Sequence, residues 1–177
     1  MTLAFVGLGA NLGDPRAAVE DAFRALAGLG PLRASPLYRT EPLGDRGDPW
    51  YVNAVAEIRT DLEPAELLAQ LLEFERRAGR SRSSETARWA PRRLDLDLLL
   101  YGDWQIDTAA LRVPHPGLAR RRFVLEPLAE LAPDLAVPGT GFSVRQLLAA
   151  LDDPLQVEKL PPDHGSQTTI GPEVPPT

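Results

Sequence analysis

The order of hydrophobic patterns along residues 3–101 constrains the fold more than any other feature of the sequence. Four stretches have the alternating or continuously apolar character of strands, namely residues 3–8, 33–39, 51–59 and 94–101. Two stretches have apolar residues at helical spacing, namely 15–29 and 62–78. Together they predict an α+β fold: a ferredoxin-like βαββαβ sheet with flanking helices.

The ends of the two predicted helices carry the expected signals. Asp14 and Pro15 begin the first helix, and Gly28 and Gly30 end it. Pro64 lies in the first turn of the second helix, and Gly79 follows its last turn. Shorter helical patterns at 124–131 and 144–151 predict additional C-terminal helices packed on the same domain.

The last part of the chain differs in composition. Residues 152–177 contain six prolines and little apolar content. Such a segment buries too little apolar surface to offset the entropy lost on ordering. We therefore expect a single domain over residues 1–151 and a disordered tail over 152–177.

Composition and charge exclude several function classes. The chain has no cysteine and only two histidines, so a thiolate nucleophile and a Cys-ligated metal are excluded, and a bound metal would be held mainly by oxygen. The net charge of −6 disfavours nucleic acid and anionic membranes as partners. No apolar run approaches the roughly 20 residues of a membrane span, and the N-terminus lacks a secretory signal, so we expect a cytoplasmic protein.

Two carboxylates are predicted to share one strand face. In the segment Leu94-Asp95-Leu96-Asp97-Leu98 the leucines alternate with the acids, so Asp95 and Asp97 project to one side and the leucines to the core. A pair held this close commonly shares a proton or binds a divalent cation. The alternative is an exposed strand face with two solvated acids.

Arginines are concentrated next to this pair. Seven lie within 18 residues: Arg76, Arg77, Arg80, Arg82, Arg88, Arg92 and Arg93. Guanidinium groups beside paired carboxylates suit a metal–polyphosphate, in which the acids hold Mg²⁺ and the arginines bind phosphate oxygens. For Arg76 and Arg77 an exposed helix face is the alternative. Glu75 lies on the apolar stripe of its helix, where a buried carboxylate needs a partner. Its role could be functional, or it could form a structural ion pair.

The glycine-rich start, Gly7 to Gly13, has the spacing G-x-G-x-x-x-G and is a poor match to a dinucleotide-binding loop. There is no Walker A sequence. The one lysine, Lys159, lies close to the C-terminal end, so the phosphate-binding lysine of P-loop proteins and protein kinases has no counterpart.

Several polar and aromatic residues could form a second half of the site. Tyr51 and Asn53 share a strand face and suit a flat heterocycle, although a surface pair on an edge strand explains them as well. Phe123 follows three arginines and could stack on a ring or anchor a helix in the core. His115, close to Arg121, could bind phosphate, act as a general acid or be structural.

These residues together resemble the hydroxymethyl-dihydropterin pyrophosphokinase family of folate biosynthesis. Four separate segments carry the resemblance in order and spacing: Tyr38 to Gly44, Tyr51 to Asn53, Arg88 to Asp97, and Val113 to His115 followed by Arg121 and Phe123. The resemblance extends from about residue 2 to residue 151.

The resemblance implies transfer of pyrophosphate from ATP to the hydroxymethyl group of 6-hydroxymethyl-7,8-dihydropterin, with AMP released. It implies two Mg²⁺ ions at Asp95 and Asp97, and catalytic roles for these acids and for Arg80, Arg82 and Arg92. It assigns the pterin to Thr40, Leu43, Tyr51, Asn53 and Phe123. It assigns ATP to Glu75, Arg82, Trp89, Arg92, Leu98, His115 and Arg121.

A monomer without a required protein partner is the expected state of such an enzyme. The alternative from another class is a non-catalytic, ferredoxin-like module that senses Mg-nucleotide through the same groups and lacks a pterin pocket. Because phosphoryl transfer of this kind depends mainly on positioning and charge neutralisation, no general base is required.

Overall fold

The computed structural model describes residues 1–42, 47–79 and 93–162. Within these residues the central sheet has the strand order β5-β1-β4-β3-β8, and β2 also pairs with β4. Every pairing in it is antiparallel. Its strands are β1 (Thr2–Ala10), β2 (Leu32–Ala34), β3 (Tyr38–Thr40), β4 (Tyr51–Thr60), β5 (Asp95–Tyr101) and β8 (Val157–Lys159). A separate hairpin joins β6 (Ile106–Asp107) to β7 (Arg112–Val113).

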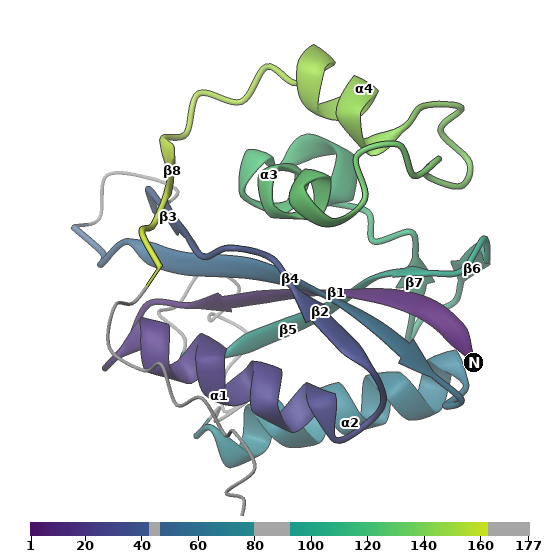
Figure 1. Ribbon diagram of the computed structural model, residues 1–177, viewed down its shortest axis with the longest axis horizontal. Helices are drawn as coiled ribbons and strands as arrows, with labels where there is room; N and C mark the ends of the chain where they lie inside the picture. Colours follow the sequence, from purple (N-terminus) through teal and green to yellow (C-terminus); the bar gives the residue numbers. More distant parts are fainter. Residues whose placement is uncertain (43–46, 80–92, 163–177) are drawn as a thin grey trace, which may run out of the picture.

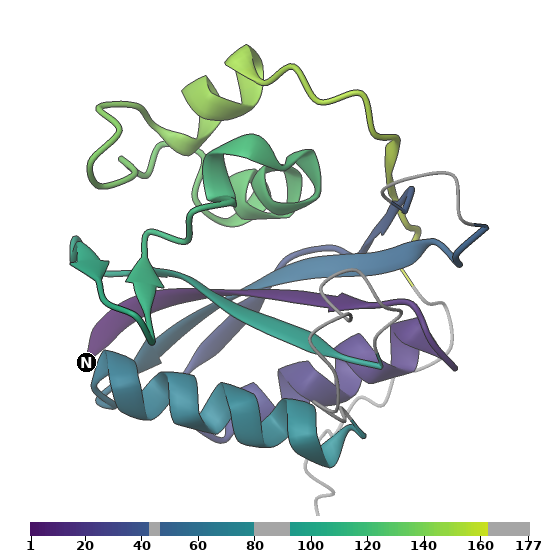
Figure 2. The same cartoon turned by 180° about the vertical axis from the view of Figure 1, so that it is seen from behind.

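Helices cover both faces of this sheet (Figures 1 and 2). On one face lie α1 (Pro15–Ala27) and α2 (Pro64–Arg77), and on the other lie α3 (Arg122–Leu131) and α4 (Val144–Ala150). A 3₁₀ turn at Leu118–Arg120 leads into α3. No helix within the described ranges is long and apolar enough to cross a membrane.

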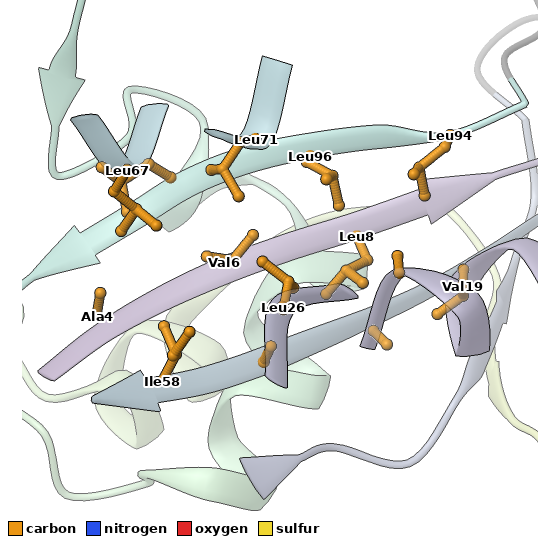
Figure 3. Packing of buried hydrophobic residues seen from close by; sticks show 14 of the residues in the cluster. Ala4, Val6, Leu8, Val19, Leu26, Ile58, Leu67, Leu71, Leu94 and Leu96 are labelled. Carbon is orange, nitrogen blue, oxygen red and sulfur yellow. The ribbon is translucent and has the colours of Figure 1, made fainter. Parts of the chain in front are cut away.

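The period of two along each strand divides the apolar residues between two cores. Figure 3 shows the core under α1 and α2, where Val6 and Leu8 of β1 meet Leu26, Leu71 and other aliphatic side chains. The core on the opposite face is built around Phe5, Val55, Leu99, Leu125 and Leu128. The sheet is therefore buried on both faces over much of its area.

The predicted helix starts are confirmed by local hydrogen bonds. The Asp14 carboxylate accepts from the Ala17 backbone N–H at 3.0 Å, and Pro15 follows it. At the second helix the Glu66 carboxylate accepts from the Glu63 backbone N–H at 2.9 Å. Both contacts satisfy N–H groups that a helix terminus leaves without intrahelical partners.

The strand expected over residues 33–39 is divided into two short strands. Pro36 has no N–H to donate, which interrupts the ladder between β2 and β3. Ser35 fills the gap, because its hydroxyl accepts from the Val55 N–H at 2.9 Å while its own N–H donates to the Val55 carbonyl at 2.9 Å. Both halves pair with β4, but the register shifts by one residue between them: Ala34 lies opposite Ala56, whereas Tyr38 lies opposite Asn53.

The prediction of disorder from residue 152 is wrong for the part of that segment that the structure describes, residues 152–162. β8 pairs with the edge strand β3, with Lys159 opposite Tyr38 and Val157 opposite Thr40 (Figure 1). Leu160 extends this contact by donating its N–H to the Leu37 carbonyl at 2.8 Å. The segment is too short and too polar to form its own core, but a neighbouring strand edge supplies the partners that composition does not reveal.

Side chains attach the same segment to two further elements. The Lys159 ammonium donates to the Glu130 carboxylate of α3 at 2.6 Å, and Tyr38 donates its hydroxyl to the same oxygen at 2.7 Å. Burial and the nearby Glu130 raise the pKa of Tyr38, so its hydroxyl keeps its proton. Arg16 of α1 donates to the Pro161 carbonyl at 3.1 Å. The C-terminal segment thereby connects both helical layers to the sheet.

Truncation after Asp153 is expected to lower the melting temperature. It removes the β3–β8 pairing and the Lys159–Glu130 contact but keeps Asp153, whose carboxylate accepts from the Arg122 N–H at 2.9 Å at the start of α3. A loss of about 2 kcal/mol corresponds to about 4–8 °C for a chain of this size. Thermal unfolding of the two chains tests this, and equal melting temperatures would show that β8 adds no stability.

Glu130→Gln is expected to destabilise the protein in a pH-dependent way. Hydrogen bonds from Lys159 and Tyr38 lower the pKa of Glu130 below its usual 4.5, so its ionised form stabilises the fold above that pH and the benefit is lost as the pH falls through the folded pKa. Because the carboxylate is partly exposed, the difference at pH 7 should be below about 1 kcal/mol. Urea unfolding at pH 7 and pH 3 measures it, and a difference that grew at pH 3 would contradict the assignment.

Candidate active site

A cavity of about 440 Å³ opens on the sheet face that α3 covers. Its floor is formed by three adjacent strands, β5, β1 and β4, and its sides by β3, the segment before α3 and the start of α3 itself. The lining residues are Gly7, Leu8, Gly9, Thr40, Glu41, Pro42, Asp48, Tyr51, Asn53, Ala54, Val55, Asp95, Asp97, Leu99, Arg112, His115, Pro116, Gly117, Arg121, Phe123, Val124 and Leu155.

Paired carboxylates form one end of this cavity, as the alternation of β5 predicted. Asp95 and Asp97 are half-buried and line the cavity. Leu94, which precedes them, and Leu96, which lies between them, are buried in the core under α1 and α2. In the β1–β5 register, Asp95 lies opposite Gly9 and Asp97 opposite Gly7. Because neither glycine has a side chain, β1 leaves open space beside both carboxylates.

His115 approaches the same carboxylates from the segment before α3. Its Nε2 lies 3.9 Å from the Asp97 carboxylate, and its Nδ1 accepts from the Gly117 N–H at 3.0 Å. Burial lowers the pKa of His115, the Arg121 charge acts in the same direction, and Asp97 and Asp95 oppose them. The neutral ring therefore carries its proton on Nε2 and presents a hydrogen-bond donor to the cavity.

Arg121 and Phe123 add a cation and an aromatic ring at the start of α3. The Arg121 guanidinium lies 5.8 Å from the centre of the Phe123 ring, and both residues line the cavity. Phe123 also packs against the core on this face of the sheet, so its two proposed roles, stacking and anchoring, are compatible. Gly117 permits the close approach, since a Cβ there would lie 2.7 Å from the Arg121 Nε.

A polar and aromatic group forms the other end. Tyr51 and Asn53 of β4 and Thr40 of β3 all line the cavity, and Asn53 is 6% exposed. The Asn53 Nδ2 donates to the Thr40 Oγ1 at 2.8 Å. The ring and the amide that the sequence placed on one strand face therefore point into the same cavity as the carboxylates.

Two predicted ATP contacts, Glu75 and Leu98, are not among the lining residues. The Leu98 side chain is buried in the core under α2, on the opposite face of β5. Glu75 is 1% exposed, and its carboxylate accepts from the Leu96 backbone N–H at 2.8 Å. Within the described residues β5 pairs only with β1. The Glu75 carboxylate therefore gives an acceptor to the other edge of β5, at Leu96 between the two aspartates. This contact is a structural hydrogen bond to a backbone N–H, whereas the structural alternative from the sequence was an ion pair.

Five of the predicted site residues lie outside the described ranges: Leu43, Arg80, Arg82, Trp89 and Arg92. Of the remaining predictions, eight residues are brought together in the cavity: Thr40, Tyr51, Asn53, Asp95, Asp97, His115, Arg121 and Phe123. These come from four strands or segments far apart in the sequence.

Sequence reasoning missed Gly9 and Leu155 as parts of this site. The glycines near the start were considered only as a nucleotide loop, although a glycine at every second position of a strand signals close approach on one face. Leu155 lies in the segment expected to be disordered, and nothing in its composition indicates that it closes the cavity wall. Glu41 and Asp48 are further acidic lining residues to which the sequence assigned no role, although Glu41 lies in the segment Tyr38 to Gly44 that resembles the family.

The residues present fit a magnesium ion that is shared with a phosphate ligand. Among the described residues no group of three or more His, Asp or Glu side chains could hold a metal alone. Magnesium is usually bound by one or two carboxylates together with substrate phosphates, and the Asp95–Asp97 pair supplies this donor set. Arg121 and the His115 Nε2 donor lie close by for the remaining phosphate charge.

Carboxylates with cationic groups at one end and an aromatic–amide pair at the other define a class of site: phosphoryl transfer between a metal-bound polyphosphate and a planar ring compound. The model of the 7,8-dihydro-6-hydroxymethylpterin-pyrophosphokinase family matches residues 5–133. The chain belongs to this family and is a pyrophosphokinase.

Relatives with this activity in their names match most of the chain. A 2-amino-4-hydroxy-6-hydroxymethyldihydropteridine pyrophosphokinase of Pseudomonas aeruginosa is 44% identical over 161 residues, which cover 89% of this chain and 96% of the relative. The enzyme of the same name from Bacillus subtilis is 36% identical over 147 residues, covering 81% and 86%. This membership favours the enzyme over the non-catalytic sensing module.

Solved structures show the same fold. A crystal structure of Plasmodium falciparum HPPK-DHPS wild type with SDX-DHP superimposes with a TM-score of 0.62 at 13% identity, and covers 84% of this chain. A triple mutant of that protein gives a TM-score of 0.66 at 13% identity over 84% of this chain. The chain spans 43% and 44% of these two longer proteins.

Replacing Glu75 is expected to reduce stability through β5. Glu75→Ala removes the acceptor of the buried Leu96 N–H, which should cost about 1–3 kcal/mol, whereas Glu75→Gln keeps an acceptor and should cost less. Urea denaturation of both variants measures the difference. If alanine and glutamine gave equal stabilities, the hydrogen bond to Leu96 would not be the reason for burying this carboxylate.

Proposed function

We propose that this chain transfers pyrophosphate from ATP to the hydroxymethyl group of 6-hydroxymethyl-7,8-dihydropterin in the cavity above β5, β1 and β4, and so contributes to folate biosynthesis. The observation that carries the proposal is the arrangement of one cavity in a member of this family. Asp95 and Asp97 line it from β5, Tyr51 and Asn53 line it from β4 on the other side of β1, and Phe123 lines it from the start of α3.

The carboxylate end would hold the reacting phosphates. Asp95 and Asp97 are proposed to bind two Mg²⁺ ions, which when bound neutralise phosphate charge and polarise the phosphoryl group. Arg121 and the neutral His115 would donate hydrogen bonds to phosphate oxygens from the segment before α3. These groups are fixed by the fold before the substrate arrives, so they need little reorganisation during the reaction.

Other groups keep the ATP roles that the resemblance implies. Arg80, Arg82 and Arg92 would add guanidinium donors to the phosphates, and Trp89 would contact the nucleotide. For Glu75 and Leu98, whose side chains lie away from the cavity, we propose indirect support: both shape β5, the strand that carries the two aspartates.

The opposite end would hold the pterin. Asn53 offers an amide that can both donate and accept in the plane of the ring, and Phe123 and Tyr51 offer aromatic surface. Thr40 and Leu43 complete the group that the resemblance assigns. With the ring held there, its hydroxymethyl oxygen would point along the floor toward the carboxylate end, which is the positioning that a direct attack on the β-phosphorus requires.

We also propose a fold topology, a cellular location and an oligomeric state for this enzyme. The strand order β5-β1-β4 with β2 and β3 outside β4 supports a ferredoxin-like βαββαβ core, to which β8, β6, β7, α3 and α4 are additions. The net charge of −6 supports the absence of nucleic acid and anionic membrane from its partners, and we propose a cytoplasmic location. Lining groups of both kinds, acidic and aromatic, come from one chain in the described part of the cavity, which supports a monomer that needs no protein partner.

The reaction products test the proposed function directly. Purified protein is incubated with ATP, Mg²⁺ and the pterin alcohol, and nucleotides and pterins are separated by chromatography. AMP and a pterin diphosphate are expected in equal amounts. ADP with a pterin monophosphate would indicate ordinary kinase chemistry instead, and the absence of pterin-dependent AMP would contradict the proposal.

Asp95→Asn and Asp97→Asn are each expected to lower kcat/KM by about 10³, because each removes a charged metal ligand without changing side-chain size. The melting temperature without Mg²⁺ should stay the same or rise, since the change relieves repulsion between neighbouring acids. Asp21→Asn is the matched control, because Asp21 lies on α1 and pairs with Arg24. Near-normal activity of both variants at ordinary Mg²⁺ would exclude the metal assignment.

A further inference from the structure

We propose that Asp153 is a positioning residue of the active site, because its carboxylate holds the first turn of α3, where Arg121 and Phe123 line the cavity. The inference rests on the proposed function and adds to it a residue from the segment that the sequence predicted to be disordered.

The start of α3 lacks a cap from its own side chains. The helix begins at Arg122, and Arg121 occupies the cap position without making a capping hydrogen bond. Helices are usually capped by Ser, Thr, Asp or Asn, whose side-chain oxygen accepts from an N–H of the first turn. A guanidinium group has donors only, so Arg121 cannot act in this way. An acceptor for this helix end has to come from another part of the chain.

Asp153 supplies that acceptor from 31 residues further along the sequence. Its Oδ2 accepts from the Arg122 backbone N–H at 2.9 Å, and its Oδ1 accepts from the Leu155 backbone N–H at 3.1 Å. Arg122 contacts the same segment in return, because its guanidinium donates to the Leu151 carbonyl at 3.1 Å. Hydrogen bonds in both directions therefore join the helix start to the C-terminal segment.

Asp153 itself lies behind the cavity wall. It is not among the lining residues of the cavity, but it lines an adjoining hollow of about 360 Å³ together with Arg121, Phe123 and Leu155. These three residues line the main cavity as well. The carboxylate can therefore influence the reaction only through its neighbours, which is what distinguishes a positioning residue.

The N–H that Asp153 holds belongs to the residue between Arg121 and Phe123. One hydrogen bond thus restrains the backbone that carries both side chains, one proposed to contact phosphate and the other the pterin ring. Without it, the first turn of α3 should open more often, as helix ends with few restraints do. A displacement of about 1 Å can cost up to about 10² in rate, so activity should fall even though the chain stays folded.

Steady-state kinetics of Asp153→Ala and Asp153→Asn in the full chain test this role. With ATP, Mg²⁺ and the pterin alcohol, Asp153→Ala should lower kcat/KM by about 10- to 100-fold. Asp153→Asn keeps one acceptor oxygen, but its amide nitrogen cannot accept from the second N–H, so a loss of about three- to tenfold is expected. Values within twofold of the parent for both variants would overturn the proposal.

Asp14→Ala is the matched control for losing a helix cap. Asp14 caps α1 by accepting from the Ala17 N–H at 3.0 Å, and α1 lies on the opposite face of the sheet (Figure 1). Both alanine variants should lower the melting temperature by about 2–4 °C. Asp14→Ala should nevertheless keep kcat/KM within about twofold of the parent. If it lost as much activity as Asp153→Ala, general destabilisation would explain the effect.

A double-mutant cycle tests whether Asp153 acts through Arg121. The dissociation constant of Mg-ATP is measured by calorimetry without the pterin. Asp153→Ala should weaken binding by about fivefold in the parent, but by less than about twofold when Arg121 is already alanine, because no guanidinium then remains to be displaced. Equal weakening in both backgrounds would show that Asp153 does not work through this arginine.

Amide hydrogen exchange provides a readout that does not depend on activity. Exchange over residues 120–126 should be faster in Asp153→Asn than in the parent, and unchanged in Asp14→Asn. Unchanged exchange in Asp153→Asn would contradict the proposed contact. This pair of asparagine variants decides the proposal if Asp153→Ala fails to fold.

The same measurements separate the inference from the proposed function. A parent protein that forms no pterin-dependent AMP contradicts the proposed function, whatever the exchange data show. A parent that forms AMP, with Asp153 variants that match it in kcat/KM, leaves the function intact and overturns the positioning role.

Discussion

The register of β1 between β4 and β5 is the constraint on which the rest of the structure depends. One set of alternate β1 residues fills the core under α1 and α2, and the other set includes the two glycines that lie opposite Asn53, Asp95 and Asp97. Since strand side chains alternate, a shift by one residue would place aliphatic groups in the cavity and glycines in the core. The hydrogen bonds that stabilise the sheet therefore also determine where Asn53 of β4 and the two aspartates of β5 lie around the cavity.

The two faces of the sheet differ in the side chains that they carry: one face is packed against helices, and the other also lines the cavity. Toward α1 and α2 the strands present mainly aliphatic side chains, which form a buried core. Toward α3 the strands carry apolar side chains around Phe5, Val55 and Leu99. Next to them, at the cavity, the residues are mostly polar or are glycines. The packed part supports the floor, and the polar part lines the cavity, as is usual for sites built on regular elements.

The sequence predicted most of the sheet and half of the site because both depend on local periodicity. Alternation of leucine and aspartate was sufficient to place Asp95 and Asp97 together, and the same argument placed Tyr51 with Asn53. The β3–β8 pairing joins residues more than a hundred positions apart, so no local pattern announces it. Glu75 shows a third situation: the helical stripe predicted its burial, but only the fold reveals that its partner is a strand N–H.

The chain's single lysine has a consequence for labelling chemistry. Reagents that acylate amines can reach the α-amino group of Met1, which contacts Asp61, and the half-exposed ammonium of Lys159, which contacts Glu130. Acylation of Lys159 would remove its positive charge at the junction of β8 and α3. The adduct on Lys159, readable by mass spectrometry without any engineered residue, would then mark the molecules in which the contact with Glu130 is lost.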